Sequence, residues 1–445
     1  MFFKLLKDAF KVKNVRTKIL FTIFILFVFR MGTHITVPGV NVKSLEALSS
    51  IPFLNMLSLV SGNAMRNFSI FALGVSPYIT ASIIVQLMQM DLVPKFVEWG
   101  KQGEVGRRKL NQATRYISLA LAFVQSVGIT ASFNALSGAQ LTTMPLNWKT
   151  YLVIGVILTT GSAIVTWLGE QITDKGYGNG TSMIIFAGII SSLPDTLHDI
   201  YIDRFVNIES SRLGESALLV GVLLVAVLGI VYFTTFVQQA EYKIPIQYTK
   251  RAQGAPTSSY LPLKLNPAGV IPVIFAGSIT AIPTSLLQFF ASQNKNISWL
   301  SNIREYFDYS TIKGMIVYAV LIILFTFFYS FVQVNPEKAA ENLQKSGAYI
   351  HGVRPGKGTE EYFSKLLMRL ATVGSLFLGF VALLPILAQN VFGLTSKIAF
   401  LGTSLIIVIM TSIEGIKQLE GYLLKRKYVG FMETEIEGKT KIATL

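Results

Sequence analysis

The sequence predicts an all-α polytopic membrane protein whose helices cross the bilayer ten times, and two features lead to this prediction. Hydrophobic residues make up 51% of the 445 residues and charged residues only 14%, with a mean hydropathy of +0.53. A soluble domain averages about 25% charged residues, so this chain has too few for a surface of its size in water. The apolar residues gather into ten segments near the roughly 20 residues that a span needs. Because backbone groups in lipid must be paired within the protein, segments of this length are helices.

The ten predicted spans follow one another along the whole chain. Their apolar cores are Ile19–Ile35, Ile70–Leu92, Tyr116–Ala135, Tyr151–Leu168, Ser182–Ile202, Ala217–Val237, Pro267–Phe290, Met315–Val334, Leu366–Leu387 and Phe400–Ile416. The fifth core is interrupted by Asp195, His198 and Asp199, which leave Met183–Leu193 as its only strongly apolar part.

The first span imitates a secretory signal peptide, because six basic residues in segment 1–18 precede an apolar run. The run is too long for the apolar region of a signal peptide, and it carries Arg30. It ends at Val37-Pro38-Gly39 without the small residues of a cleavage site. We therefore expect an uncleaved first span.

Two of the ten segments are broken by glycine and proline, and they hold matching places in the chain. Pro52–Leu92 contains Gly62, Gly74 and Pro77. The second broken segment is Asn266–Phe290, which contains Pro267, Gly269, Pro272, Gly277 and Pro283. They are segments two and seven, the second member of each group of five. Interrupted segments at corresponding positions of a repeated membrane protein indicate where substrate passes. The pattern therefore predicts a route between segments two and seven.

The distribution of Lys and Arg predicts the orientation. One side of the predicted topology carries 28 of the 39 basic residues and the other side carries 9, while Arg30 and Arg369 lie within spans. The basic side consists of residues 1–18, Val93–Arg115, Gly169–Thr181, Gln238–Asn266, Asn335–Lys365 and the tail from Lys417. By the positive-inside rule both termini are cytoplasmic.

The chain lacks the motifs of most enzymes, and the sequence predicts neither a catalytic site nor a cofactor or metal. It has no cysteine, and its three histidines, His34, His198 and His351, are far apart. Residues 351–359 resemble a phosphate-binding loop but have the wrong glycine spacing, and Lys357 is followed by Gly358 instead of Ser or Thr. The glycines at 176, 178 and 180 lack the dinucleotide-binding spacing and are expected to form a tight turn between spans four and five.

A ten-span secondary transporter is the alternative function. Such proteins often place paired carboxylates or polar relays within their spans. The polar residues near or within spans are Arg30, His34, Gln86, Gln89 and Glu414. Most are close to span ends, and no buried acid pair suited to protons or sodium is evident.

Three predicted cytoplasmic loops are long and basic. Val93–Arg115 contains the contiguous Arg107, Arg108 and Lys109, while Gln238–Asn266 and Asn335–Lys365 carry prolines and glycines that shape them. Positive-inside topology and attraction to anionic lipid explain part of this charge. Many bundle connections need only 2–8 residues, however, so loops of this length favour docking of an acidic partner or RNA.

Several motifs, in order along the chain, resemble the bacterial SecY family, the channel subunit of the protein translocase. They are Phe71–Ile84 (FALGVSPYITASII), Gly103–Lys109 (GEVGRRK), Trp167–Thr173 (WLGEQIT), Leu261–Asn266 (LPLKLN) and Gly352–Gly356 (GVRPG). The resemblance extends over essentially the full length. It departs after Gly254, where Ala255-Pro256 stands in place of further basic residues that the family often carries.

The resemblance implies two inverted five-helix halves around an hourglass pore. The halves are residues 19–202 and 203–416, the docking loops are 238–266 and 335–365, and the tail is 417–445. The family opens sideways to lipid between spans two and seven. A half-helix called the plug, here residues 53–67, blocks its outer funnel when no substrate is present.

The resemblance also assigns roles to individual residues. A constricting aliphatic ring is matched by Val75, Ile79, Ile185, Ile274 and Ile407. The plug includes Leu57, Val60, Gly62, Asn63 and Met65, and the lateral gate includes Ile83, Gln86, Gly277 and Ser278. The residues that the resemblance assigns to partner docking are Arg107, Arg108, Arg251 and Arg354. Without the resemblance, ordinary packing or lipid contact is the better explanation of any one of these aliphatic residues, and the small residues indicate only close helix packing.

We therefore expect a non-enzymatic, protein-conducting channel in the cytoplasmic membrane. It would translocate unfolded secretory proteins and release hydrophobic segments laterally into the lipid. The partners that the resemblance implies are the subunits SecE and SecG, the motor ATPase SecA, the ribosome, signal sequences with their preproteins, and membrane lipids.

Overall fold

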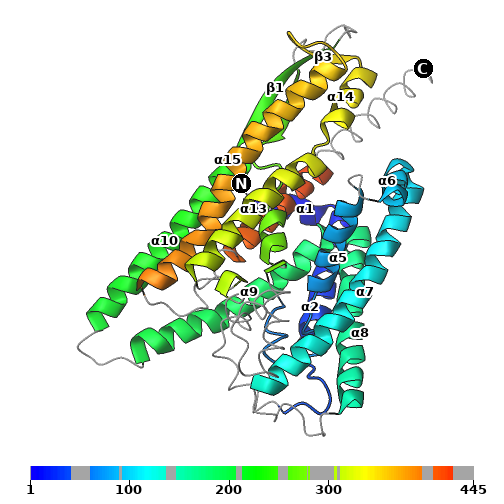
Figure 1. The fold of residues 1–445 in the computed structure, drawn as a ribbon. Helices are drawn as coiled ribbons and strands as arrows, with labels where there is room; N and C mark the ends of the chain where they lie inside the picture. Colours follow the sequence, from blue (N-terminus) through cyan, green and yellow to red (C-terminus); the bar gives the residue numbers. More distant parts are fainter. Residues whose placement is uncertain are drawn as a thin grey trace, which may run out of the picture.

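The structure is a computed structural model, and it consists mainly of long helices (Figure 1). It describes residues 2–41, 61–89, 93–136, 147–206, 213–248, 259–277, 279–280, 305–307, 311–392 and 404–423. The helical class predicted from composition is confirmed, with a small sheet in addition.

The first part of the chain forms a bundle around α8. Its helices are α1 (Phe2–Lys11), α2 (Lys13–Gly32), α5 (Ser76–Leu87), α6 (Pro94–Lys101), α7 (Gly103–Leu136), α8 (Trp148–Lys175) and α9 (Gly180–Tyr201). Helix α8 packs against α2, α7 and α9, and α5 packs along α7. The extended backbone of Val12 separates α1 from α2, with φ −88° and ψ 109°. The predicted glycine turn between α8 and α9 is confirmed, since Gly178 has φ +87° and α9 begins at Gly180.

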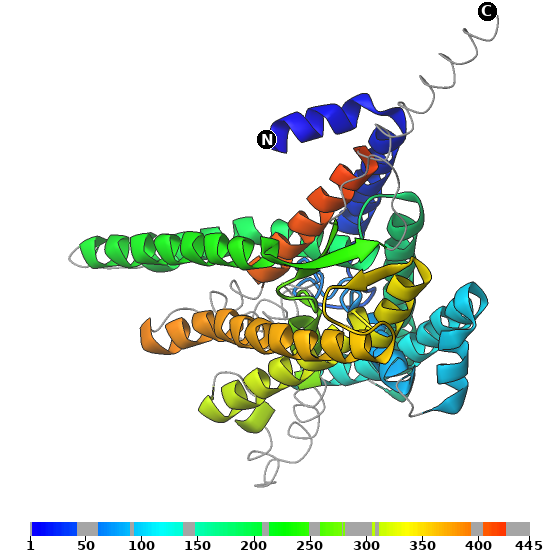
Figure 2. The same cartoon turned by 90° about the horizontal axis from the view of Figure 1, so that it is seen from above.

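The second part contains long helices and the strands between them. Its elements are the π-helix Ile202–Val206, α10 (Leu213–Gln239), β1 (Glu241–Tyr248), β2 (Ser259–Lys264), α13 (Ile312–Gln333), α14 (Pro336–Lys345), β3 (Ala348–Ile350), α15 (Lys357–Phe392) and an unlabelled helix at residues 404–423. Helix α13 packs along α15. Helices α10 and α15 extend side by side, away from α6 and α7 (Figure 2), and the rings of Phe233 and Phe377 meet between them at 5.5 Å.

A three-stranded antiparallel sheet, in the order β2-β1-β3, stands beyond one end of this bundle (Figure 1). Ile246 at its centre pairs with Ser259 on one side and Ile350 on the other. Ile244 and Ile246 are buried against Phe363 of α15. The sequence analysis predicted shaped loops here and missed the sheet, although burial at every second residue of β1 is the pattern of a half-buried strand.

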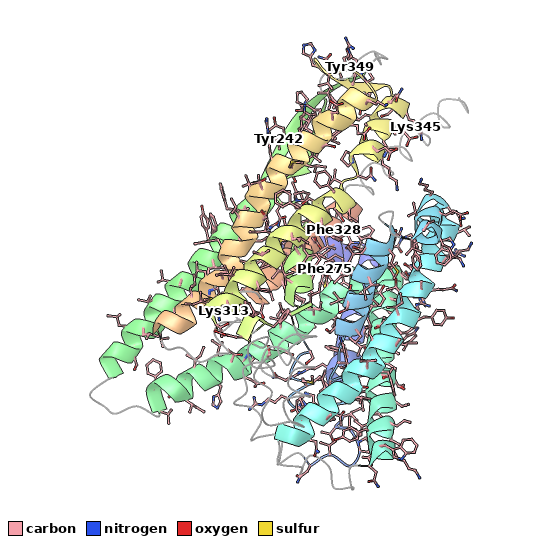
Figure 3. All side chains as sticks on the ribbon, in the orientation of Figure 1. Tyr242, Phe275, Lys313, Phe328, Lys345 and Tyr349 are labelled. Carbon is pink, nitrogen blue, oxygen red and sulfur yellow. The ribbon has the colours of Figure 1, made fainter. Side chains whose placement is uncertain are left out.

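One hydrophobic core connects the two parts. It combines buried residues of α2, α5, α8 and α9 with those of the 268–276 segment, α13, α15 and the 404–423 helix. Phe275, labelled in Figure 3, contributes to this core. Its ring packs edge-on against Phe325 and Tyr329 of α13, with centroids 6.0 and 5.8 Å apart. The halves predicted from sequence therefore share their interior packing.

Five helices within the described residues are long and apolar enough to cross a membrane. They are Trp148–Lys175, Gly180–His198, Ser216–Gln239, Ile312–Lys345 and Lys357–Ala388. The second predicted span differs from its expected limits of Ile70–Leu92. Its helix starts only at Ser76, because Gly74 takes a positive φ of +55° and Pro77 occupies the first helical turn.

Candidate functional site

The five aliphatic residues predicted to form a pore ring all belong to the shared core or pack against it. Val75, Ile79, Ile185 and Ile407 are buried members of the core cluster, and the partly buried Ile274 packs against it. They come from four separate parts of the chain: the start of α5, α9, the 271–277 helix and the 404–423 helix. Both parts of the molecule thus contribute ring candidates to this core, and the ring itself stays a prediction.

The segment of residues 61–69 precedes α5 in the chain and contacts both α2 and α9. It forms consecutive turns, with left-handed backbone at Gly62 (φ +65°) and Asn63 (φ +64°). The half-helix that the family resemblance implied for 53–67 is therefore absent from the described part, 61–67. Of the predicted plug residues, Leu57 and Val60 lie outside the described residues, and Met65 is buried in a second core.

Backbone pairing fixes one end of the 61–69 segment. The amide of Val37 donates to the carbonyl of Phe68 at 3.0 Å, and the amide of Ile70 donates to the carbonyl of Ile35 at 2.9 Å. Thr36 and Ser69 form an isolated antiparallel bridge between these two bonds. The chain after span one is therefore tied to the chain before α5.

The other end of the segment makes polar contacts to two spans. Arg30 of α2 donates from Nη1 to the carbonyl of Gly62 at 2.7 Å. Asn63 donates from Nδ2 to Oδ2 of Asp195 on α9 at 2.6 Å. The sequence analysis noted Arg30 and Asp195 only as polar interruptions of spans, because Gly62 and Asn63 are distant from them in sequence.

The predicted lateral gate falls at α5 and the 271–277 helix. Ile83 is buried in the shared core, and Gly277 is buried as well. Gln86 donates from Nε2 to the hydroxyl of Ser82 at 3.3 Å, while its buried Oε1 has no partner. Ser278 lies outside the described residues.

The predicted docking arginines are solvent-exposed where the structure describes them. Arg107 and Arg108 lie on the first turns of α7, and Arg354 lies in the turn between β3 and α15. Gly352 and Gly356, with φ of +79° and +85°, bracket that turn and give it its shape. Arg251 lies outside the described residues.

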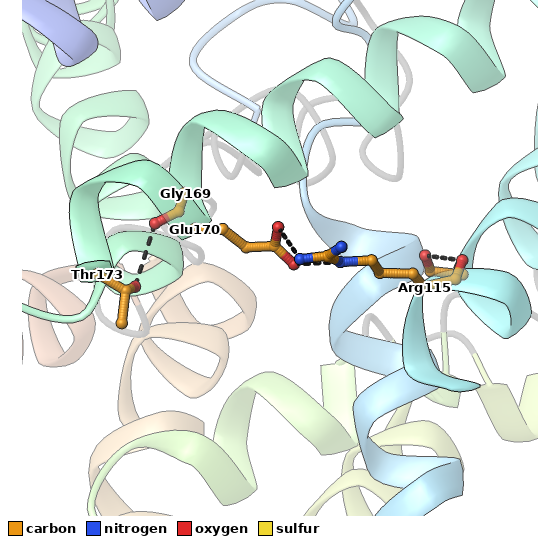
Figure 4. A network of polar contacts seen from close by, with 5 residues as sticks. Arg115, Gly169, Glu170 and Thr173 are labelled. Carbon is orange, nitrogen blue, oxygen red and sulfur yellow. Dashed lines mark hydrogen bonds and ion pairs between the residues drawn. The ribbon is translucent and has the colours of Figure 1, made fainter. Parts of the chain in front are cut away.

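The Trp167–Thr173 motif joins three helices through hydrogen bonds. Figure 4 shows the link from Glu170 to Arg115. Glu170 of α8 accepts two bonds from Arg115 of α7, from Nε at 2.8 Å and from Nη2 at 2.6 Å. Thr173 donates to the carbonyl of Gly169 and accepts from the amide of Gly180 at 2.9 Å. This motif therefore positions the turn between α8 and α9.

The central residues of the region are aliphatic, while Arg30 bonds to backbone and Asn63 bonds to Asp195. In the parts of the chain that the structure describes, no group of three or more His, Asp or Glu side chains is placed to hold a metal ion. The class that the fold and this site define is a polytopic helical membrane protein with an apolar centre and basic, structured loops at one end.

The SecY family model matches residues 69–416, and the chain belongs to the SecY family. Curated relatives named "Protein translocase subunit SecY" include those of Streptococcus gordonii, 73% identical over 98% of this chain and 99% of the relative, and Lactococcus lactis strain IL1403, 65% identical over 99% and 100%. The Bacillus subtilis relative is 48% identical over 97% of this chain and all of its own length.

Solved structures share the fold at low sequence identity. "The structure of a protein conducting channel" superposes with a TM-score of 0.63 at 18% identity, covering 91% of each chain. Sec61 from the canine ribosome-channel complex of the endoplasmic reticulum superposes at 0.60 with 17% identity, again over 91% of each. The fold of this chain is thus that of the SecY and Sec61 channels.

Proposed function

We propose that this chain is the protein-conducting subunit of a translocase in the cytoplasmic membrane. The observation that carries the proposal is membership of the SecY family along nearly the whole chain, at up to 73% identity to curated translocase subunits. The aliphatic centre and exposed basic loops agree with that role. The chain acts as a channel and takes the energy for transport from a partner.

The proposed architecture has ten spans in two inverted halves, residues 19–202 and 203–416. The tail, 417–445, and the N-terminal segment, 1–18, are cytoplasmic in this arrangement. The bias of basic residues supports it, because they accumulate on the predicted inner side. The 238–266 and 335–365 loops then face the cytoplasm, and the β2-β1-β3 sheet belongs to them.

Val75, Ile79, Ile185, Ile274 and Ile407 would form the waist of the channel. Bulky aliphatic side chains offer no hydrogen bonds, so a narrow ring of them can exclude water and ions. They also yield around a passing chain without selecting its sequence. Their common location in the core shared by both parts supports this role.

The plug, 53–67, would close the outer side of this waist. Lateral release would occur between α5 and the segment-seven helix, where Ile83, Gln86, Gly277 and Ser278 lie in the sequence. Small residues on these two segments allow close approach with weak adhesion. A signal sequence would be sensed by inserting at this seam.

The partners would be SecE, SecG, SecA, the ribosome, preproteins and membrane lipids. Exposed Arg107, Arg108 and Arg354, together with Arg251 in the tip of the 238–266 loop, would meet an acidic protein surface or RNA phosphate. Among the structural relatives, the yeast Ssh1 complex was solved bound to the yeast 80S ribosome. The Ssh1 chain is 14% identical to this chain, so the comparison shows a shared fold only.

Purified reconstitution tests the proposed function against the secondary transporter. Vesicles containing this chain with SecE and SecG should protect an unfolded preprotein from protease only when SecA and ATP are supplied. Uptake of a small solute driven by an ion gradient, without preprotein protection, would support the transporter and overturn the channel.

A further inference from the structure

Two charged side chains, one in span one and one in span five, have no role in the channel described so far. Arg30 lies near the end of α2, and Asp195 follows Pro194 within α9. Ionisable residues inside membrane spans are costly, so they are retained where they have a partner. Both of these residues contact the same short piece of chain, residues 62 and 63.

Arg30 contacts the backbone of the 61–69 segment. Its Nη1 lies 2.7 Å from the carbonyl oxygen of the buried Gly62 and 3.4 Å from the hydroxyl of Thr33. The Thr33 hydroxyl in turn donates to the carbonyl of Arg30 at 2.7 Å, which holds the two residues on one turn. Because the donor is charged, its bond to Gly62 is stronger than a bond between neutral groups.

Asp195 contacts the side chain of the next residue. Its Oδ2 accepts from Nδ2 of Asn63 at 2.6 Å, which is a short bond to a carboxylate. Asn63 reaches Asp195 from left-handed backbone, which asparagine adopts more readily than most residues. Consecutive left-handed residues at 62 and 63 thus present a carbonyl to α2 and an amide side chain to α9.

The backbone at Gly62 packs directly against α9. A Cβ atom at Gly62 would lie 2.9 Å from Cα of Gly188 and 3.3 Å from Oγ of Ser191. The segment therefore sits directly on α9, one helical turn or two from Asp195. Residues 62 and 63 are thus held by Arg30 on α2 and Asp195 on α9, and by the close contact of Gly62 with Gly188.

We propose that Arg30 and Asp195 form a polar clasp that holds the 61–69 segment in the closed channel. The inference rests on the proposed function, and it adds positioning residues from spans one and five to the proposed plug. Opening requires the Gly62 and Asn63 bonds to break together, while the backbone pairing at Phe68 and Ile70 keeps the segment attached. The clasp sets how readily a weak signal sequence opens the channel.

The clasp can be locked chemically, since the chain has no cysteine to interfere. The double variant Asn63→Cys/Asp195→Cys lacks the bond and should leak ions at rest. A short bis-methanethiosulfonate cross-linker should then seal it and block translocation, and dithiothreitol should restore both. Each single-cysteine variant, treated in the same way, is the control. Normal translocation through the fully cross-linked double variant would overturn the clasp.

Substitution of Arg30 and Asp195 gives an independent test of the clasp. Arg30→Met and Asp195→Ala should each raise the resting conductance and the export of a preprotein with a defective signal sequence, on the order of tenfold for loss of a charged hydrogen bond. Arg30→Lys keeps a charged donor and should recover part of the seal. Lys149→Met removes an exposed charge at the start of α8 and should change neither quantity.

The same vesicles separate failure of the clasp from failure of the proposed function. If the unmodified chain does not move a preprotein with SecA and ATP, the channel function is wrong. If it does, and folded Arg30→Met and Asp195→Ala variants keep its resting conductance and signal-sequence requirement, the clasp is wrong. Folding is checked by gel filtration and thermal unfolding in detergent.

Discussion

Arg115 and Glu170 form a two-pronged ion pair that joins α7 to α8, with N–O distances of 2.8 and 2.6 Å. Glu170 is part of the Trp167–Thr173 motif that identified the family in the sequence. In the structure this motif bonds to Arg115 through Glu170 (Figure 4) and to the amide of Gly180, at the start of α9, through Thr173. It is therefore expected to serve folding.

Disrupting this ion pair should lower stability and leave transport intact. A double-mutant cycle of Arg115→Met and Glu170→Gln should give a coupling free energy of up to about 1 kcal/mol, since Arg115 is more than half exposed. The exposed pair Lys345 and Glu341 on α14 is the matched control and should couple more weakly. Loss of translocation by folded Glu170→Gln protein would assign the motif a direct role in transport.

The orientation can be tested by labelling introduced cysteines. Glu104→Cys and Lys357→Cys should react with a membrane-impermeant maleimide only from the cytoplasmic side, and Asn147→Cys only from outside. All three positions are exposed and avoid the left-handed glycines nearby, so the substitutions should not strain the backbone. The reverse labelling pattern would exclude the proposed topology.

The docking hypothesis predicts a specific defect for Arg354→Glu. Reversing this exposed charge places like charges at the contact, which costs several kcal/mol as a rough estimate. ATP-dependent translocation should be lost while insertion and thermal stability are kept. His351→Glu introduces a negative charge in the same turn and is the matched control. Equal losses in the two variants would indicate general repulsion and no particular role for Arg354.

A salt bridge between the 404–423 helix and β1 predicts a pH dependence of stability. Lys417 Nζ lies 2.8 Å from Glu241 Oε1, and this hydrogen bond lowers the pKa of Glu241 below its ordinary value of 4.5. A lowered folded-state pKa contributes stability that is present above pH 4.5 and lost as pH falls through the folded value. The thermal stability advantage over Glu241→Gln should therefore shrink below pH 4.5. An advantage that is constant down to pH 3 would contradict this contribution.

The helical class was predictable because composition and segment length constrain it directly. The sheet was missed because the apolar alternation in Glu241–Tyr248 is short and contains Pro245. Strand β1 also depends on β3, about a hundred residues away, for three of its nine residue pairs, the other six being with β2. The late start of α5 depends on the backbone of Gly74, which the sequence marked as a break without giving its extent.

The candidate site was predictable where chemistry repeats a family motif, and unpredictable where it depends on packing. The ring residues were assigned by resemblance, since isolated aliphatic residues carry no signal of their own, and their sealing role stays a prediction. In the sequence, Arg30 and Asp195 were recognisable only as charged residues that interrupt spans one and five. Their partners, a carbonyl and an amide in residues 62 and 63, become apparent only when the segment lies between α2 and α9.

The proposed waist makes a prediction that distinguishes sealing from packing. Ile79 and Ile322 are both buried in the shared core, but only Ile79 belongs to the proposed ring. Truncating either to Ala should cost stability, typically 2–5 kcal/mol for a large aliphatic residue in a core. Ile322→Ala therefore serves as the control, because it loses core packing without changing the proposed ring.

Planar-bilayer recording on the purified variants separates the two effects. Ile79→Ala combined with Ile185→Ser and Ile407→Ser should widen and hydrate the waist, because fewer methyl groups line it and hydroxyl groups bind water. Resting ion currents should rise and discrimination against defective signal sequences should fall, as the closed state loses stability relative to the open one. Ile322→Ala should lower the melting temperature without added current. Unchanged currents in a folded ring variant would exclude the proposed seal and leave these residues a packing role.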